Sequence, residues 1–179
     1  MKTHWIIGLF LMAIVGCQPE NSLQTITVSD QFRLTIPSFL KKTDALNDQA
    51  ALQYMSAFRE FYVIVIVDNK IEVQNQLILN GLEEEYSIDL DGFAKLSIHY
   101  SAENIFHTEN ITFDTVVINN LNAYAFRLNT FSQDHPVYFH CALIEGKNRF
   151  YQLFTWTLTE KESIHKNQMN DIINSFNEI

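Results

Sequence analysis

The stretch FYVIVIV, from Phe61 to Val67, contains only aromatic and β-branched residues. Polar residues close it on both sides, Arg59-Glu60 before it and Asp68-Asn69-Lys70 after it. Successive residues of a strand point to opposite faces of the sheet, and here both sets are apolar. The stretch therefore predicts a central strand that is covered on both faces.

The chain before this strand has the pattern of a β-hairpin. Gln24–Val28 and Phe32–Ile36 alternate apolar and polar residues, and the polar residues Ser29-Asp30-Gln31 separate them, as in a turn. Pro37 closes the second run, and Ala51–Ser56 predicts a third strand before the central one. We therefore expect an N-terminal hairpin followed by two further strands.

After the central strand the apolar period changes to three and four, which is typical of helices. Ile71–Leu82 predicts a short helix, and the spacing from Leu90 to Tyr100 predicts a second helix with Asp89 or Asp91 as its cap.

The second half of the chain has the pattern of a β-meander. Its runs of aromatic and β-branched residues are Phe113–Ile118, Leu121–Phe131, Val137–Glu145 and Arg149–Leu158. The short connections between them favour antiparallel neighbours. A terminal helix is predicted to open with the capping box Thr159-Glu160-Lys161-Glu162 and to carry one apolar stripe as far as Phe176.

The turns of the meander, as they are written, predict which side chains share a face. Arg127, Cys141 and Leu153 are expected on one face. The other face is expected to hold Tyr138, His140, Phe154 and Trp156. A slip of one residue in the register would move every side chain to the opposite face.

The first 16 residues have the pattern of a signal peptide rather than of a folded element. They contain one cation, Lys2, and an apolar run of about half the roughly 20 residues that a membrane-spanning helix requires. Ile14-Val15-Gly16-Cys17 resembles the bacterial lipobox, in which the Cys is acylated and becomes the new N-terminus. The resemblance implies that Cys17 anchors the protein through its acyl chains. An ordinary secretory signal and a permanent transmembrane anchor are the alternatives.

Residues 17–23 are then a short polar tether. Gln18 follows the Cys, where enterobacterial lipoproteins carry an Asp for retention in the inner membrane. We therefore expect the protein at the outer membrane, facing the periplasm.

The charge of the chain limits its partners. Without residues 1–16 it carries 11 Lys and Arg against 21 Asp and Glu, a formal charge of −10. Nucleic-acid binding depends on basic patches that neutralise phosphates, so no nucleic-acid partner is expected. Attachment to anionic lipid through a polybasic surface is equally disfavoured, and the acyl group is expected to hold the protein at the bilayer. With Cys17 acylated, Cys141 has no intramolecular partner, and the fold relies on its core.

The order of these elements resembles the PsbP-like superfamily, which includes bacterial DcrB-type lipoproteins and a Ran-binding nuclear transport factor. The resemblance rests on FRLTIP at Phe32–Pro37, on the hairpin at Tyr138–Thr157 and on the closing IINSF at Ile172–Phe176. It implies an α+β fold, an α-β-α sandwich in which a mostly antiparallel sheet has helices on both faces, built as one domain over residues 24–179. Members of the superfamily generally act as accessory or binding proteins, and the fold identifies no partner.

The side chains that commonly carry chemistry form no recognisable motif. The histidines after the signal segment are His99, His107, His135, His140 and His165. They show no metal-binding spacing, no phosphate loop or G-x-S-x-G occurs, and we expect neither a metal nor a cofactor. Cys141, in an apolar run, is interpreted as a buried and inert thiol, with a catalytic nucleophile as the alternative. Arg127 either pairs with an acid or anchors an anionic ligand.

These observations favour a non-enzymatic, membrane-anchored periplasmic lipoprotein that binds an envelope protein as an accessory module. The alternative is a carrier of a small ligand, with Tyr138, Phe154 and Trp156 lining an aromatic pocket. Its candidate contact residues are Arg127, Tyr138, His140, Phe154 and Trp156. A hydrolase that uses Cys141 and a distant His is a third hypothesis.

Overall fold

The fold is taken from a computed structural model that describes residues 22–101, 105–107, 111–132 and 134–179. Cys17 and the rest of the N-terminal segment up to residue 21 lie outside the described residues. The elements, in chain order, are β1 (Leu23–Val28), β2 (Phe32–Pro37), β3 (Lys41–Lys42), β4 (Ala50–Ser56), β5 (Phe61–Asn69), α1 (Lys70–Asn80), α2 (Leu90–Ser101), β6 (Asp114–Ile118), β7 (Leu121–Ser132), β8 (His135–Glu145), β9 (Arg149–Leu158), α3 (Glu162–Asn174) and β10 (Asn177–Glu178).

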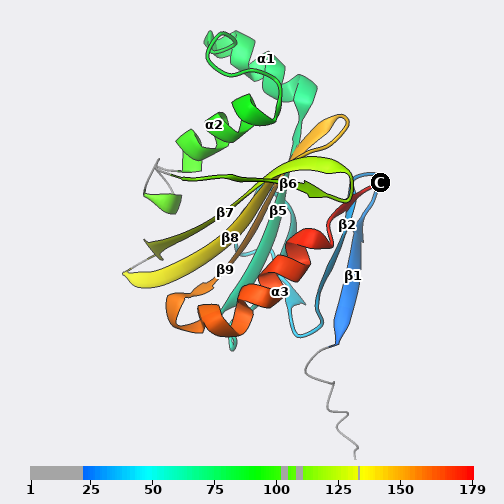
Figure 1. Cartoon of the computed structure of the whole chain (residues 1–179). Coiled ribbons are helices and arrows are strands. Elements are labelled where there is room, and N and C mark those ends of the chain that lie inside the picture. Colours follow the sequence, from blue (N-terminus) through cyan, green and yellow to red (C-terminus); the bar gives the residue numbers. More distant parts are fainter. Residues whose placement is uncertain (1–21, 102–104, 108–110, 133) are drawn as a thin grey trace, which may run out of the picture.

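The strands form two antiparallel sheets (Figure 1). The larger has seven strands in the order β3-β4-β5-β9-β8-β7-β6, and the smaller has the order β1-β2-β10. Strand β5 lies inside the large sheet and pairs with β9 along its full length, from Phe61 opposite Thr157 to Asn69 opposite Arg149. The predicted central strand is therefore confirmed, as is the N-terminal hairpin of β1 and β2.

Helix α3 and the small sheet cover one face of the large sheet, and α2 covers part of the other (Figure 1). The predicted α+β architecture, an antiparallel sheet between helices, is confirmed. Strand β5 contributes to both layers because Phe61, Val63 and Val65 point to the α3 face and Ile64 points to the α2 face.

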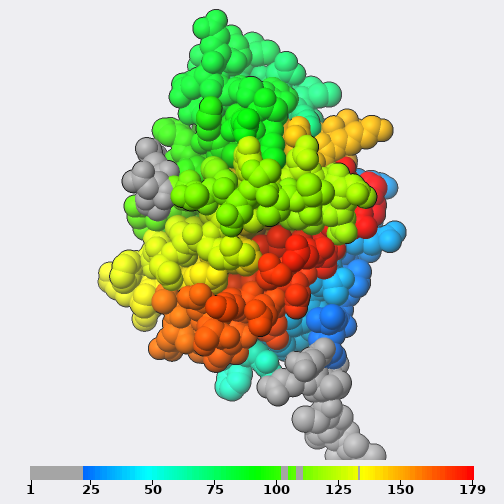
Figure 2. Space-filling model, in the orientation of Figure 1, coloured from blue at the N-terminus to red at the C-terminus, as the bar shows by residue number. Residues whose placement is uncertain are grey.

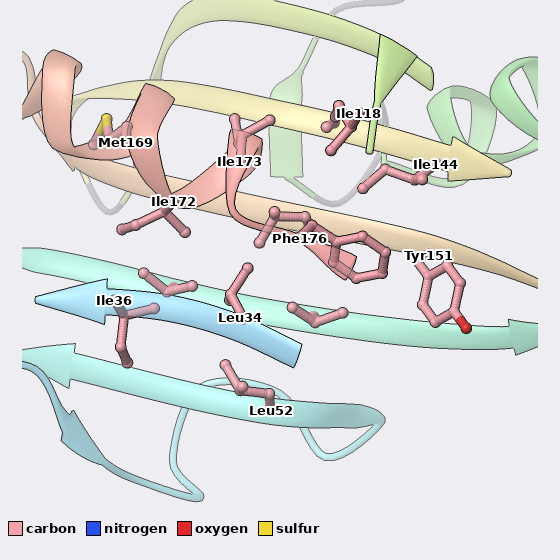
Figure 3. Packing of buried hydrophobic residues seen from close by; sticks show 14 of the residues in the cluster. Leu34, Ile36, Leu52, Ile118, Ile144, Tyr151, Met169, Ile172, Ile173 and Phe176 are labelled. Atoms are coloured by element: carbon pink, nitrogen blue, oxygen red, sulfur yellow. The ribbon is translucent and has the colours of Figure 1, made fainter. Parts of the chain in front are cut away.

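The core on the α3 face is closed. Figure 3 shows the apolar stripe of α3 meeting side chains of β2, β4, β8 and β9. Met169, Ile172 and Ile173 of α3 are at most 3% exposed. Phe176 follows the helix, is fully buried, and stacks on Phe32 of β2 with 5.3 Å between ring centroids. This layer therefore joins the N-terminal and the C-terminal parts of the described chain.

The core on the α2 face is less complete. Phe93 of α2 stacks on Phe150 at the start of β9, with 4.2 Å between ring centroids. The Asp89 carboxylate accepts a hydrogen bond from the Gly92 N–H at 2.9 Å, so Asp89 is the predicted cap, whereas Asp91 accepts one from the Tyr124 hydroxyl. Helix α1 projects beyond the sheet, and Leu77 is its one buried residue. Helix α2 thus covers one end of its face and leaves the other end to loops.

The predicted distribution of side chains over the two faces of the sheet was wrong, because the strand register differs by one residue from the predicted one. The Gly146 N–H donates to the Arg149 carbonyl at 2.9 Å, so the hairpin of β8 and β9 turns over two residues, Lys147-Asn148, rather than three. Cross-strand partners share a face. Cys141 is therefore opposite Phe154 rather than Leu153. The turn between β7 and β8 is shorter than predicted as well, because Ser132 pairs with His135, and Arg127 is opposite His140 rather than Cys141.

The corrected faces separate the candidate residues. Arg127, Tyr138, His140 and Leu153 lie on the α3 face. Cys141, Phe154 and Trp156 lie on the α2 face. A pocket that combines Tyr138 with Phe154 and Trp156 is therefore impossible in this sheet.

The terminal helix also differs from its prediction. Thr159–Lys161 forms a 3-10 turn, and α3 begins at Glu162 without a side-chain cap. The Thr159 hydroxyl instead bonds the Asn129 side chain at 3.2 Å, which anchors the turn to β7. The helix ends at Asn174, and the last residues form β10, a strand that the sequence did not predict.

Two isoleucines of α3 test the contribution of the closed layer. Ile172 is 1% exposed and Ile164 is 65% exposed. Ile172→Ala leaves a cavity and should lower the free energy of unfolding by about 2–5 kcal/mol, whereas Ile164→Ala should change it by no more than about 0.5 kcal/mol. Urea denaturation followed by circular dichroism measures both. Equal effects of the two substitutions would contradict the assigned face of α3.

Candidate functional site

A cleft opens on the α2 face, beyond the end that α2 covers. Its volume is about 380 Å³, and we call it the aromatic cleft. It is lined by Leu46, Asn47, Ile64, Ile105, His107, Phe131, Ser132, Phe139, Phe154 and Trp156. Two of the predicted contact residues, Phe154 and Trp156, therefore belong to a real cavity, although the other residues around them are not those predicted.

The floor of the cleft is built by the register of three strands. Tyr62, Trp156 and Phe139 are cross-strand partners on β5, β9 and β8. Trp156 stacks on Tyr62 at 5.1 Å between centroids, with 10° between the ring planes, and on Phe139 at 5.7 Å with 25°. The indole is thus held between two rings, which fixes its orientation and leaves it half-buried.

One wall of the cleft comes from the short segment 105–107. Phe106 is 1% exposed, and its ring meets Phe126, Phe139 and Phe154 edge to face at 5.4 to 6.0 Å. The buried Thr130 hydroxyl donates to the Phe106 carbonyl at 2.9 Å and fixes the segment on β7. Burial of Phe106 therefore sets Ile105 and His107 at the cleft.

The opposite wall is a loop held by a buried amide. Gln53 of β4 is 8% exposed and points to the α2 face. Its side-chain oxygen accepts from the N–H groups of Leu46 and Asn47 at 2.9 and 3.0 Å, and its nitrogen donates to the Asn47 carbonyl at 2.6 Å. Three hydrogen bonds thus position Leu46 over the cleft.

The sequence contained weak signals for both walls. Gln53 interrupts an apolar strand, and Ile105-Phe106 is an apolar pair in a polar segment. Neither signal specified a partner, because each wall depends on contacts between residues far apart in the chain.

The lining of the aromatic cleft is mostly apolar. None of its ten lining residues is Asp, Glu, Lys or Arg, and the polar ones are Asn47, His107 and Ser132. Phe131 stands at the cleft with 63% of its surface exposed. Such a surface gains free energy by covering apolar groups and offers little to a charged ligand.

The other three candidate residues lie on the α3 face and form no cleft with Phe154 and Trp156. Tyr138 is 5% exposed and His140 is 2% exposed. The exposed Arg127 pairs with Asp114, with 3.3 Å between nitrogen and oxygen, so the interpretation that Arg127 meets an acid is confirmed. Burial, with the Glu162 carboxylate second, raises the pKa of Tyr138.

His140 is the unusual member of this group. Its Nδ1 has no hydrogen-bond partner among the described residues. Burial, with the nearby positive charge of Arg127, lowers the pKa of His140 to about 4. The imidazole is therefore neutral at physiological pH.

Cys141 has the properties of an inert thiol. It is fully buried beside Phe126 and Phe154, its cross-strand partners, and burial raises its pKa well above the usual value. The adjacent His140 points to the opposite face. A thiol with these neighbours stays protonated, which speaks against the hydrolase hypothesis.

The described part of the chain presents neither a metal-binding cluster nor a membrane-spanning helix. In it, no group of three or more His, Cys, Asp or Glu side chains is placed to hold a metal ion. Nor does any described helix combine the length and the hydrophobicity of a membrane span.

Comparison with known proteins shows the fold. No protein-family model matches the chain, and no curated protein matches its sequence. The solution structure of cyanobacterial PsbP (CyanoP) from Synechocystis is similar with a TM-score of 0.56 and 9% identity, covering 94% of this chain and 99% of that one.

Two crystal structures are similar at the same level. A Bacteroides thetaiotaomicron protein has a TM-score of 0.54 and 7% identity over 90% of this chain, which spans only 49% of that protein. A Pseudomonas aeruginosa protein of unknown function has a TM-score of 0.50 and 10% identity, covering 86% of this chain and 94% of that one. At such identities the similarity establishes the fold alone: the chain has the PsbP-like fold predicted from its sequence.

The low pKa of His140 predicts a pH dependence of stability. The unfolded chain takes up a proton at this residue below about pH 6.5, whereas the folded chain does so only near pH 4. The free energy of unfolding should therefore fall by up to about 3 kcal/mol through this residue as the pH drops from 6.5 to 4. His140→Gln should lack that part of the loss, as urea denaturation at both pH values would show.

The matched control is His135→Gln, which changes an exposed histidine. If wild type and His140→Gln lose stability in parallel between pH 6.5 and 4, the assigned protonation of His140 is wrong.

Proposed function

We propose that this chain is a lipid-anchored accessory module of the bacterial envelope, which acts by binding a protein partner rather than by catalysis. The observation that carries the proposal is the aromatic cleft, a mostly apolar cavity on the incompletely covered face of the sheet. The lipobox-like sequence ending at Cys17 supports the anchor, and the acyl chains would hold the domain at the outer membrane, facing the periplasm.

Two features favour a protein partner. Phe131 extends the apolar surface beyond the cavity, with 63% of its side chain exposed. The centres of protein interfaces are enriched in aromatic residues and depleted of charge, as this cleft is. An apolar side chain of a partner, inserted beside Trp156, would displace water from Phe139 and Phe154.

A small apolar ligand is the second candidate, and the size of the cleft favours it. A volume of about 380 Å³ is within the range of known ligand pockets, about 300–1,000 Å³. The half-buried Trp156 would then report binding, because it is the one Trp of the chain after residue 16.

Site-specific photocrosslinking in cells distinguishes the candidates. A photoreactive amino acid at Phe131 should capture one envelope protein that the same group at Val117 does not capture. Val117 is a matched control because it is 68% exposed on β6 and does not line the cleft. Capture should fall in the Cys17→Ser background, and Trp156→Ala should weaken binding of the purified partner by about tenfold or more.

Capture of the same proteins at both positions would contradict a role for the cleft in protein binding. If nothing above background is captured at Phe131 and an apolar dye quenches Trp156 fluorescence, the small-ligand candidate replaces the protein partner.

A further inference from the structure

We propose that the end of the domain next to the tether is a membrane-contact surface, at which the turn between β4 and β5 inserts Phe58 into the headgroup region of the anchoring bilayer. This inference rests on the proposed lipid anchor and adds an orientation of the domain to it. Phe58 is 93% exposed, the largest exposure among the large hydrophobic side chains of the described residues.

Hydrogen bonds and ring contacts place this turn beside the start of the described chain. Ser22 bonds Ser38 through both hydroxyls and through the Ser38 N–H, which donates to the Ser22 carbonyl at 2.8 Å. Phe39, the next residue, carries the Arg59 guanidinium over its ring at 4.2 Å. Arg59 adjoins Phe58, so one continuous set of contacts runs from the tether to the turn.

The pictures agree with these contacts. In Figures 1 and 2 the β4–β5 turn and the start of β1 are at the lower end of the molecule, and α1 with α2 is at the upper end. Five peptide units separate Cys17 from Ser22, and a chain of that length reaches at most about 18 Å. An acylated Cys17 would therefore hold this end of the domain close to the bilayer.

The charges at this end do not oppose contact with a phospholipid surface. Lys41 and Lys42 of β3 pair with Met55 and Tyr54, next to the turn, and Arg59 is within it. The one acid of the turn, Glu60, is neutralised by Lys161 at 2.6 Å. The acids Asp44, Glu160 and Glu162 also lie near these residues, so cations and acids balance at this end. In a chain of formal charge −10 after residue 16, this is therefore a region that anionic headgroups would not repel.

Further exposed apolar residues lie near the same end. Leu23, which begins β1, is 67% exposed, and Ile164, in the first turn of α3 after Lys161, is 65% exposed. An aromatic side chain flanked by cations and aliphatic residues is the composition of an interfacial membrane contact. Because the chain as a whole is acidic, the acyl chains would still provide the anchor. The membrane-contact surface would set the orientation of the domain on the bilayer.

The opposite end of the domain is acidic. Glu72, Glu83, Glu84 and Glu85 lie on or beside α1, and its Lys70 is paired with Glu145 at 2.7 Å. Anionic headgroups would repel this end, so its exposed Leu79, at 77%, provides a matched control for Phe58.

Quenching by brominated lipid tests the proposal. The full-length precursor is expressed, and the acylated protein is reconstituted into vesicles of phosphatidylethanolamine and phosphatidylglycerol, with or without bromine on the acyl chains. The fluorescence of the introduced Trp is obtained by subtracting the wild-type signal. For Phe58→Trp we expect this fluorescence to be about twofold lower in the brominated vesicles than in the unbrominated ones. For Leu79→Trp the added fluorescence should not change.

Mass spectrometry of the N-terminal peptide separates two kinds of failure. If Cys17 carries no acyl group, the proposed anchor is wrong and the membrane-contact surface falls with it. If Cys17 is acylated and Phe58→Trp is no more quenched than Leu79→Trp, the anchor stands and the membrane contact is wrong, and a protein becomes the occupant to test at this surface.

Discussion

Strand β5 requires cover on both of its faces, and the rest of the domain is arranged to provide it. Its side chains alternate between two apolar layers, with Phe61, Val63 and Val65 in one and Ile64 in the other. Pairing with β9 on one edge and β4 on the other leaves no edge exposed to solvent. Burial of apolar area drives this arrangement, because an uncovered face would leave the most hydrophobic strand of the chain in water.

The two layers are unequal, and that inequality creates the candidate site. On one face α3, β2 and Phe176 close the core completely. On the other face α2 reaches only the end near Phe150, and the remaining area is bordered by the loop that Gln53 holds and by the segment around Phe106. Loops adapt to a ligand at lower cost than a packed helix does, which is why binding sites are common where loops cover a rigid sheet.

The sequence predicted elements well and contacts poorly, for identifiable reasons. The runs around β5, β8 and β9 are long and strongly patterned, so local preference and tertiary structure agree. The faces were wrong because Gly146 in one hairpin, and Ser132 with His135 in the other, continue the ladder instead of turning, which their own identities do not reveal. The capping box at Thr159 was overridden by a hydrogen bond to Asn129, a residue 30 positions away. Phe154 and Trp156 were identified as cleft residues, whereas Tyr138 belongs to the opposite layer.

Native-state hydrogen exchange tests the unequal cover most directly. Amides of buried, cooperatively packed elements exchange through global unfolding, and those of weakly packed elements exchange through local openings. We expect the amides of β5, β8, β9 and α3 to be the slowest, and those of α1 and of the 43–49 loop at the cleft to exchange at lower free energies. If α1 and the 43–49 loop were as well protected as α3, the cleft would be part of a closed core, and the unequal cover of the sheet would be disproved.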